Sequence, residues 1–220
     1  MAANDDKNRF QINRLDNRGC FVEVKSDWFA RNQIHFEFAS YDMKRPEGER
    51  FTNHINIYLD GSKFLALASD ILSGSMLNEL RYPVLPADAP LFEHLGGTSA
   101  AKMSGIYGNP RSDGMGLSRI MKIVRANKRD SVMLVADSGP GEANKTGLVV
   151  PRFGGKPENH VVISLDYYQL KQLVAPAKVQ YEAYCQAIMF KRVMDGEFSN
   201  SSDYRSNSPA PYPNAVNFNA

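Results

Sequence analysis

The chain has 220 residues, of which 43% are hydrophobic, and its formal net charge is +2. A chain of this length and composition can bury one large core or two small ones, which excludes disorder over most of its length. Its only cysteines, Cys20 and Cys185, lie far apart in the sequence, so we expect two free thiols in a reducing compartment and neither a disulfide framework nor a cysteine metal site.

The sequence carries no pattern expected of a secretory signal or a membrane span. The first residues lack the basic-then-apolar order of a secretory signal, and no apolar run approaches the ~18 residues of a membrane span. We therefore expect a cytoplasmic protein without a membrane partner. Residues 1–8 and the polar, proline-containing tail 195–220 are expected to be disordered.

The first half of the chain predicts four strands followed by a helix. Two short β-type runs at 10–15 and 20–25 flank a glycine-containing turn and are expected to form a hairpin. Segments 33–41 and 52–59 alternate apolar and polar residues, which is typical of half-buried strands. Asp60 can then cap a helix, because an apolar stripe at helical spacing follows it.

A long segment at 78–115 separates this unit from the next. It is rich in glycine and proline, and it is longer than an ordinary connection between elements. We therefore expect a linker that either carries a function or wraps over the body of the protein.

The second half repeats part of the first. The octapeptide NHINIYLD at 53–60 returns 106 positions later as NHVVISLD at 159–166. A second alignment, at an offset of 111, lays 10–25 over 121–136 and makes 121–126 and 131–136 strands, although 121–126 alone also fits a helix. Residues 137–141 are then a turn, with a third strand at 147–153 and a fourth at 159–165.

A final helix follows the second copy of the octapeptide. Asp166 is expected to cap it, as Asp60 caps the first helix. The apolar stripe of this helix continues past Pro176, which predicts a kink there and not an end.

The repeat predicts an α+β fold in which two pseudo-symmetric antiparallel four-stranded sheets are each followed by a helix. A single domain would span 9–194, with repeat 1 at about 9–77 and repeat 2 at about 116–194. This ββββα-ββββα order resembles the Whirly fold, the duplicated relative of the transcriptional-coactivator fold that binds single-stranded DNA, and the sequence is also similar to small proteins of bacterial mobile elements. The resemblance implies homo-oligomers, dimers or tetramers, that hold single strands along their sheets with little base specificity.

Basic and aromatic side chains recur at matching places in the two halves, as a single-strand binder requires. At the offset of 111, Arg14 aligns with Arg125 and Arg18 with Arg129. The candidate phosphate contacts are Arg14, Arg18, Arg45, Arg50, Lys122, Arg125, Lys128, Arg129, Arg152 and Lys156. The candidate base contacts are Tyr41, Phe51, His54, Tyr58, Phe153 and His160.

These residues also have purely structural interpretations. Charged turns are often simply solvated, and the two Asn-His pairs can satisfy polar groups at a strand start. Phe51 and Phe153 also fit core positions. Trp28, the sole tryptophan, is expected either to anchor a core or to stack on a base or another subunit.

Enzymes and adaptors are the competing functional classes. Segment 137–142 is similar to a phosphate-binding loop but lacks its Gly-Lys-Ser/Thr ending, and no His, Cys or carboxylate cluster has metal-ligand spacing. We therefore expect no catalytic residues, no metal and no cofactor. Single-stranded DNA is the expected partner, and RNA binding or an oligomeric adaptor role are the alternatives.

Overall fold

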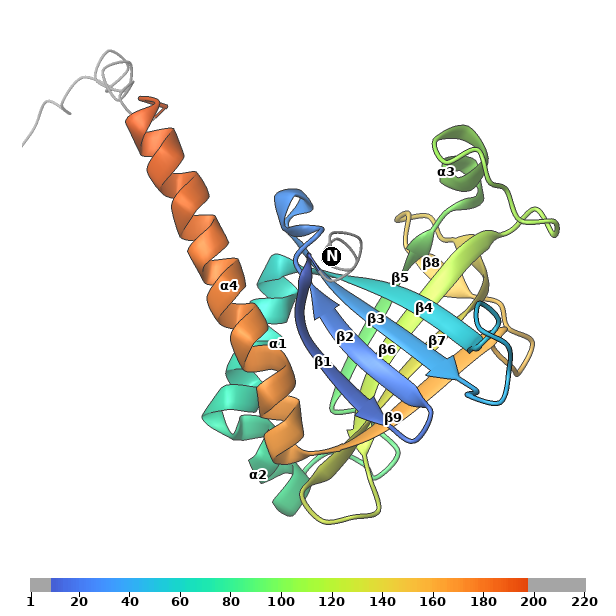
Figure 1. Cartoon of the computed structure of the whole chain (residues 1–220), viewed down its shortest axis with the longest axis horizontal. Helices are drawn as coiled ribbons and strands as arrows, with labels where there is room; N and C mark the ends of the chain where they lie inside the picture. Colours follow the sequence, from blue (N-terminus) through green and yellow to red (C-terminus); the bar gives the residue numbers. More distant parts are fainter. Residues whose placement is uncertain (1–8, 198–220) are drawn as a thin grey trace, which may run out of the picture. The chain divides into compact units, whose positions relative to one another are not determined.

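The computed structural model describes residues 9–197, and within this range the predicted α+β class is confirmed. The strands are β1 (Gln11–Asn17), β2 (Cys20–Lys25), β3 (Gln33–Tyr41), β4 (Phe51–Asp60), β5 (Phe92–Thr98), β6 (Gly116–Arg125), β7 (Ser131–Ala143), β8 (Val149–Pro151) and β9 (Asn159–Asp166) (Figure 1). The helices are α1 (Gly61–Ser73), α2 (Ser75–Arg81), α3 (Ala100–Gly105) and α4 (Tyr167–Met194), with a 3-10 turn η1 (Phe29–Arg31). Of the segments expected to be disordered, 1–8 and all but 195–197 of the tail lie outside the described residues.

The chain divides into two compact units. The first ends at Tyr181 and contains both sheets, and the second begins at Glu182, within α4. The described part of the second unit is the remainder of this helix and a hydrogen-bonded turn in which Gly196 N donates to the Val193 carbonyl.

Two antiparallel sheets form the first unit. In the first sheet the strands lie in the order β1-β2-β3-β4. In the second the order is β5-β6-β7, and the far edge of β7 pairs with β8 along 141–143 and with β9 along 131–138. Strands β8 and β9 therefore lie in line along one edge of β7, and each sheet is four strands wide, as predicted.

The pairing registers correct the predicted alignment of the two repeats. Leu59 pairs with Ile34 on β3, whereas its counterpart Leu165 pairs with Val132 on β7. Strand β7 therefore corresponds to β3, β6 to β2 and β5 to β1. The alignment at an offset of 111 is wrong by one strand.

This correction removes the predicted matches between cations of the two halves. Arg14 lies on β1, the outermost strand of its sheet, whereas Arg125 lies on β6, the second strand. Arg18 lies in the hairpin between β1 and β2, whereas Arg129 lies between β6 and β7, the strands that correspond to β2 and β3. The recurrence of these residues in the sequence therefore carries no argument for a shared role.

Segment 78–115 is not a linker outside the repeat, because it supplies β5. Two consecutive glycines hid this strand, since glycine weakens a strand pattern. Gly97 is required by the packing: its φ is +150° and a Cβ there would lie 2.4 Å from the Leu117 carbonyl oxygen. Because the backbone of β5 approaches its neighbour so closely at this point, glycines replace the side chains whose alternation would have predicted a strand.

The turn predicted at 137–141 is also wrong, because these residues continue β7 to Ala143. Their glycines allow close packing and do not reverse the chain: a Cβ on Gly141 would lie 2.7 Å from Val149 Cγ1, and one on Gly139 would lie 3.0 Å from the Phe153 ring. The third strand, predicted at 147–153, is reduced to β8.

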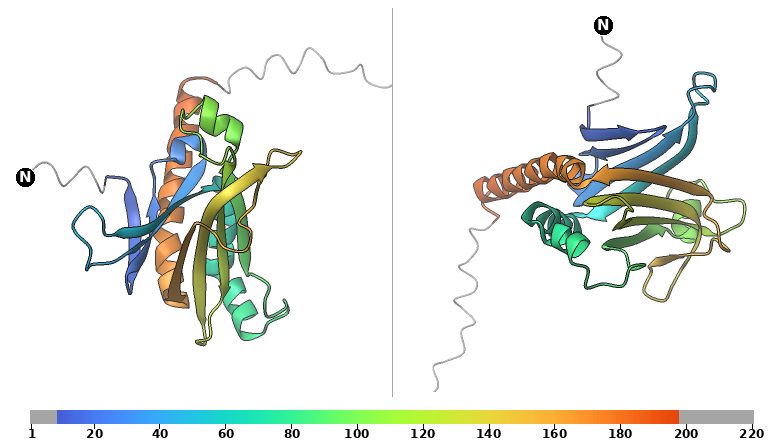
Figure 2. Two further views of the ribbon diagram at one scale, coloured as in Figure 1. Left: turned by 90° about the vertical axis from the view of Figure 1, so that its right-hand side faces the viewer. Right: turned by 90° about the horizontal axis from the view of Figure 1, so that it is seen from below.

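The core lies between the two sheets, which contact each other through β2, β4, β6 and β9 (Figure 2). Phe36, Phe38 and Ile57 point into it from the first sheet, and Met121 and Ile163 from the second. Full burial of such side chains contributes roughly 1.5–3 kcal/mol each.

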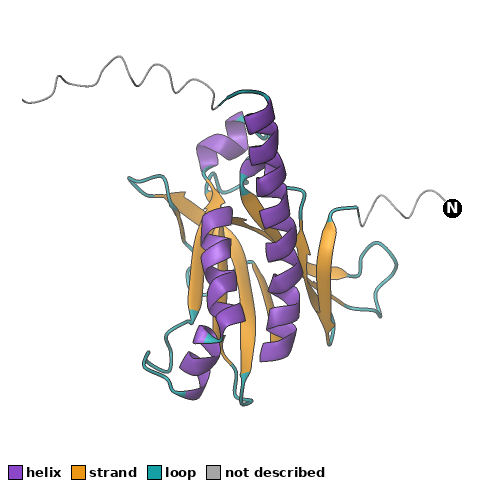
Figure 3. Ribbon diagram, turned by 90° about the vertical axis from the view of Figure 1, so that its left-hand side faces the viewer, coloured by secondary structure: helices purple, strands orange, loops and turns teal. Residues whose placement is uncertain are grey.

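Helix α1 and the part of α4 that belongs to the first unit lie on the same side of the strands (Figure 3). Phe64 and Ile71 of α1 and Leu170 and Leu173 of α4 are fully buried. The side chain of Tyr167 also joins the two helices, because its hydroxyl donates to the Ile71 carbonyl at 2.7 Å. The apolar stripes that predicted both helices are therefore their buried faces.

The two expected helix caps differ. Asp166 Oδ1 accepts from Gln169 N at 2.8 Å, and Gln169 Oε1 accepts from Asp166 N at 3.0 Å, which is a capping box. Asp60 makes no capping bond, and the third residue after it is Lys63, which has no acceptor to return one. Pro176 lies inside α4, which continues past it as predicted.

Candidate functional site

The repeated Asn-His pairs occupy the same positions in the two sheets. Asn53 Nδ2 donates to Ser40 Oγ at 2.8 Å, and Asn159 Nδ2 donates to Ser138 Oγ at 3.2 Å. The two copies also contact each other, since His160 N donates to Asn53 Oδ1 at 3.3 Å. These asparagines therefore join neighbouring strands and the two repeats.

The two histidines are also held by acidic side chains. His54 Nε2 lies 2.8 Å from Glu37 Oε1, and His160 Nδ1 lies 2.6 Å from Asp137 Oδ1. His54 and Lys25 together lower the pKa of Glu37 to about 2. The structure therefore favours the structural interpretation of the Asn-His repeat.

Several of the predicted phosphate contacts already have acidic partners. Arg14 bonds Asp16 at 2.7 Å, and its guanidinium lies 3.7 Å from the centre of the Phe21 ring. Lys122 pairs with Glu93, and Arg152 pairs with Glu142, each at 3.0 Å. An anion would have to compete with these carboxylates.

Arg125 has a structural role. Its Nη2 donates to Glu79 at 2.6 Å, and its Nη1 donates to the carbonyls of Pro86 and Ala89. Glu79 in turn accepts from the backbone N–H groups of Val84 and Leu85. The side chain of Arg125 therefore fastens the segment between α2 and β5 to the second sheet.

The remaining predicted residues lie in several turns and at the ends of β3 and β4. Arg18, Arg45, Lys128, Arg129 and Lys156 are exposed in turns, and Arg50 Nε donates to the Arg45 carbonyl at 3.4 Å. Tyr41 and the exposed Phe51 both pack against Phe21, while Phe153 covers Gly139. Of all the predicted residues, only Tyr58 lines the cleft that η1, β4, β5, α3 and β6 form in the first unit.

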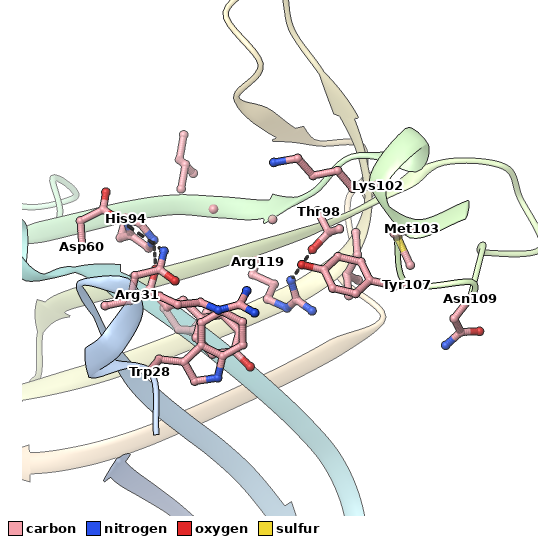
Figure 4. A pocket seen from close by; sticks show the side chains of 17 residues that line it. Trp28, Arg31, Asp60, His94, Thr98, Lys102, Met103, Tyr107, Asn109 and Arg119 are labelled. Carbon is pink, nitrogen blue, oxygen red and sulfur yellow. Dashed lines mark hydrogen bonds between the residues drawn. The ribbon is translucent and has the colours of Figure 1, made fainter. Parts of the chain in front are cut away.

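This cleft has a volume of about 760 Å³ and lies between the two sheets at one end (Figure 4). One wall is formed by η1 and β4, and the other by β5, α3 and β6. The aromatic side chains that line it are Trp28, Tyr58 and Tyr107. Its volume lies within the range of about 300–1,000 Å³ that is typical of small-ligand sites.

Packed aromatic rings form part of one wall of the cleft. The rings of Trp28 and Tyr58 are 4.3 Å apart, and Tyr58 stacks on His35 at 4.7 Å. His35 is fixed from both sides, by Asp27 at 3.0 Å and by Asn56 at 2.9 Å. The rings are therefore positioned before any ligand arrives.

Arg119 is the central cation of the cleft. Its Nη1 donates to Thr98 Oγ1 at 3.1 Å, and within residues 9–197 no carboxylate forms an ion pair with it. Partial burial lowers its pKa, and the Tyr58 and Tyr107 hydroxyls oppose that effect. Figure 4 shows the Tyr107 hydroxyl directed toward the guanidinium. This arginine is a partly desolvated cation without a matching anion.

The other charged groups of the cleft leave it positive. Arg31 covers the Trp28 ring at 4.4 Å, and Lys102 projects from α3. Asp60 is the one carboxylate among the lining residues. His94 is buried beside Lys63, and both its burial and this cation lower its pKa, so a neutral ring donates from Nε2 to the Tyr58 carbonyl. The cleft therefore combines flat rings with excess positive charge.

Sequence reasoning missed most of this site. Tyr107 and Lys102 lie in the segment predicted to be a linker, and Arg119 lies at a strand position without a counterpart cation in the repeat. The one usable signal was the spacing of Trp28 and Arg31, which places a cation beside the sole tryptophan.

Comparisons with known proteins add no family. Neither a scan against protein-family models nor a search of curated proteins finds a match for this sequence. Among the residues that the structure describes, no group of three or more His, Cys, Asp and Glu side chains is placed to hold a metal ion. No helix in this range has both the length and the apolar character to span a bilayer.

Proposed function

We propose that the protein binds single-stranded nucleic acid, DNA in the first place, and that the cleft is its contact site for a base and a phosphate. The observation that carries this proposal is the position of Arg119, a cation without a carboxylate partner in the described part of the chain, beside the packed rings of Trp28 and Tyr58. Single-strand binders combine these two features, because cations attract phosphates and rings accept any base.

The geometry supports a single strand over a duplex. Stacking on a side chain requires an exposed base face, and each stacked base contributes about 1–3 kcal/mol. The bases of a duplex are already stacked on one another. Tyr107 on the opposite wall offers a second ring (Figure 4).

The binding site proposed from the structure differs from the one predicted from the sequence. The outer face of the first sheet is largely charge-neutral, since Arg14 and Lys25 are paired there with Asp16 and Glu37. The exposed turn residues Arg18, Lys128 and Arg129 can still attract a polyanion without contacting it in one fixed geometry. We therefore assign specific contacts to the cleft and general attraction to the turns.

Fluorescence tests the proposal directly, because Trp28 is the sole tryptophan and lines the cleft. Oligo-dT should change the Trp28 emission, and its affinity should fall steeply as the salt concentration rises from about 50 to 200 mM, as expected of phosphate contacts. Single-stranded RNA and duplex DNA, measured in parallel by anisotropy, define the preference. Absence of binding by every nucleic acid at low salt would contradict the proposal.

A homo-oligomer is also proposed, on the evidence of the described part of the second unit. Met189, Phe190, Val193 and Met194 expose a continuous apolar strip on α4, and exposed strips of this kind mark protein contacts. Light scattering should give a mass above that of one chain, and Phe190→Glu should return it to the monomer value. A wild-type protein with the mass of one chain would contradict this assignment.

A further inference from the structure

We infer that the inner end of the cleft is a seat for a phosphate monoester, so that the preferred ligand is a nucleotide or strand that carries a terminal phosphate. This inference rests on the proposed function. It assigns the seat to Arg119, Thr98 and Tyr107, with Arg31 approaching from the other wall.

The first step of the argument is the set of hydrogen-bond donors. The Arg119 guanidinium uses one nitrogen on Thr98 Oγ1, which leaves further N–H groups for a ligand. The Thr98 and Tyr107 hydroxyls lie on the same side of the cleft and can each donate to an oxyanion (Figure 4). Three groups of this kind suit the several oxygens of a phosphate better than a carboxylate or a base.

The second step is the shape of the wall. Gly96 and Gly97 line the cleft beside Thr98, so the wall there is backbone without side chains. A Cβ on Gly96 would lie 3.0 Å from His94 Nε2. The wall opposite Arg119 in the register is therefore backbone, and a side chain added at Gly96 would have to displace the His94 ring.

The third step is the charge balance. Arg31, Lys102 and Arg119 line the cleft with three positive charges, and Asp60 supplies one negative charge. The resulting excess of two positive charges matches a phosphate monoester, which carries about −1.5 to −2 at pH 7. A single phosphodiester in the middle of a strand carries only one negative charge and would leave the cleft positive.

The test compares ends of the same strand. Trp28 emission is followed while oligo-dT with a 5′-phosphate, a 3′-phosphate or hydroxyls at both ends is added to the full chain. One terminal phosphate should tighten binding about tenfold or more, because hydrogen bonds to a charged group are strong. Thymidine and thymidine 5′-monophosphate form a second pair, of which only the nucleotide should bind.

Two variants locate the effect. Arg119→Met keeps the length of the side chain but removes the charge, and it should abolish the advantage of the phosphorylated strand. Arg18→Met, in an exposed turn, is the matched control and should retain it. Arg31→Gln, an exposed position, should reduce the advantage even where Arg119→Met does not fold.

The outcomes separate this inference from the proposed function. Equal affinity for all three oligo-dT strands would overturn the phosphate seat while leaving strand binding in place. Binding of the nucleotide that depends on Arg119, without binding of any strand, would support the seat and overturn the proposed function. If no ligand of either kind binds, both are wrong.

Discussion

The outer face of the first sheet and the cleft both contain an arginine beside aromatic rings, but the two arginines differ in whether a carboxylate is paired with them. On the sheet face, Arg14 lies against an aromatic ring and is bonded to Asp16, whereas in the cleft Arg119 lies near aromatic rings without a carboxylate partner in the described chain. Cations that are paired stabilise a surface, and cations that lack a partner are available to a ligand. The pairing of the charges, and not their number, distinguishes the two regions.

Replacing the arginine by methionine in the cleft and on the sheet face should give the largest difference between these two regions. Arg119→Met should weaken binding of oligo-dT by about 10- to 100-fold, because it removes charge-assisted hydrogen bonds to phosphate. Arg14→Met should change binding by less than about twofold, since its guanidinium is already committed to Asp16. Anisotropy titrations at one salt concentration measure both, and equal losses would erase the distinction.

The aromatic side chains allow a parallel comparison. Tyr107→Leu should weaken binding of oligo-dT by about 5- to 100-fold, because its ring is exposed in the cleft and one stacking surface is worth about 1–3 kcal/mol. Phe51→Leu is the control, because this ring is 59% exposed on the sheet but lies outside the cleft. A larger effect at Phe51 would move the binding site back to the sheet face.

Glu37 tests whether the charged pairs of the sheet face stabilise the fold. Its pKa of about 2 lies below the ordinary value of 4.5, so its contribution is present above pH 4.5 and is lost as the pH falls toward 2. Glu37→Gln should lower the free energy of unfolding by about 1–3 kcal/mol at pH 7. Urea unfolding should show this difference shrinking between pH 4.5 and pH 2, whereas a pH-independent difference would contradict the linkage.

Glu23, directly opposite Glu37 in the register, should behave in the opposite way. Burial is the main cause that raises the pKa of Glu23, and Lys25 only partly opposes it, so ionisation of this carboxyl is less favourable in the folded state than in the unfolded chain. Glu23→Gln should therefore leave stability unchanged or raise it by up to about 1 kcal/mol at pH 7. Urea unfolding would contradict this if the variant were clearly less stable than wild type.

The regular parts of the fold were predictable because their side chains alternate. Strands β2 and β3 were predicted with their observed bounds, and the buried faces of α1 and α4 follow the predicted stripes. Strand β5 was missed because Gly96 and Gly97 replace side chains with close backbone contacts. The alignment at an offset of 111 was wrong because it rested on a few matching residues. The correspondence of the strands is given instead by which strands pair with each other.

The candidate site was less predictable, because it depends on what each charge meets in space. Nothing local distinguishes Arg119 from Arg125: both lie on β6 and both are half-buried. Arg125 is surrounded by Glu79 and two backbone carbonyls, whereas Arg119 lines a cleft. Those partners come from segments distant in the sequence, so only the folded chain separates a structural arginine from a candidate ligand contact.

The contact between His160 N and Asn53 Oδ1 joins the two copies of the octapeptide where β4 and β9 meet. Each copy is the last strand of its sheet and is followed directly by a helix, so the chain has the organisation of a two-subunit assembly whose members have become covalently fused. Residues 82–91 form the connecting tether between α2 and β5. Such a tether keeps each half at an effective concentration of about millimolar with respect to the other. Their association is then independent of the protein concentration, and the sequences of the two halves are free to diverge. The first half holds Arg14 paired with Asp16, whereas the second half holds Arg119, with which no carboxylate of residues 9–197 forms an ion pair.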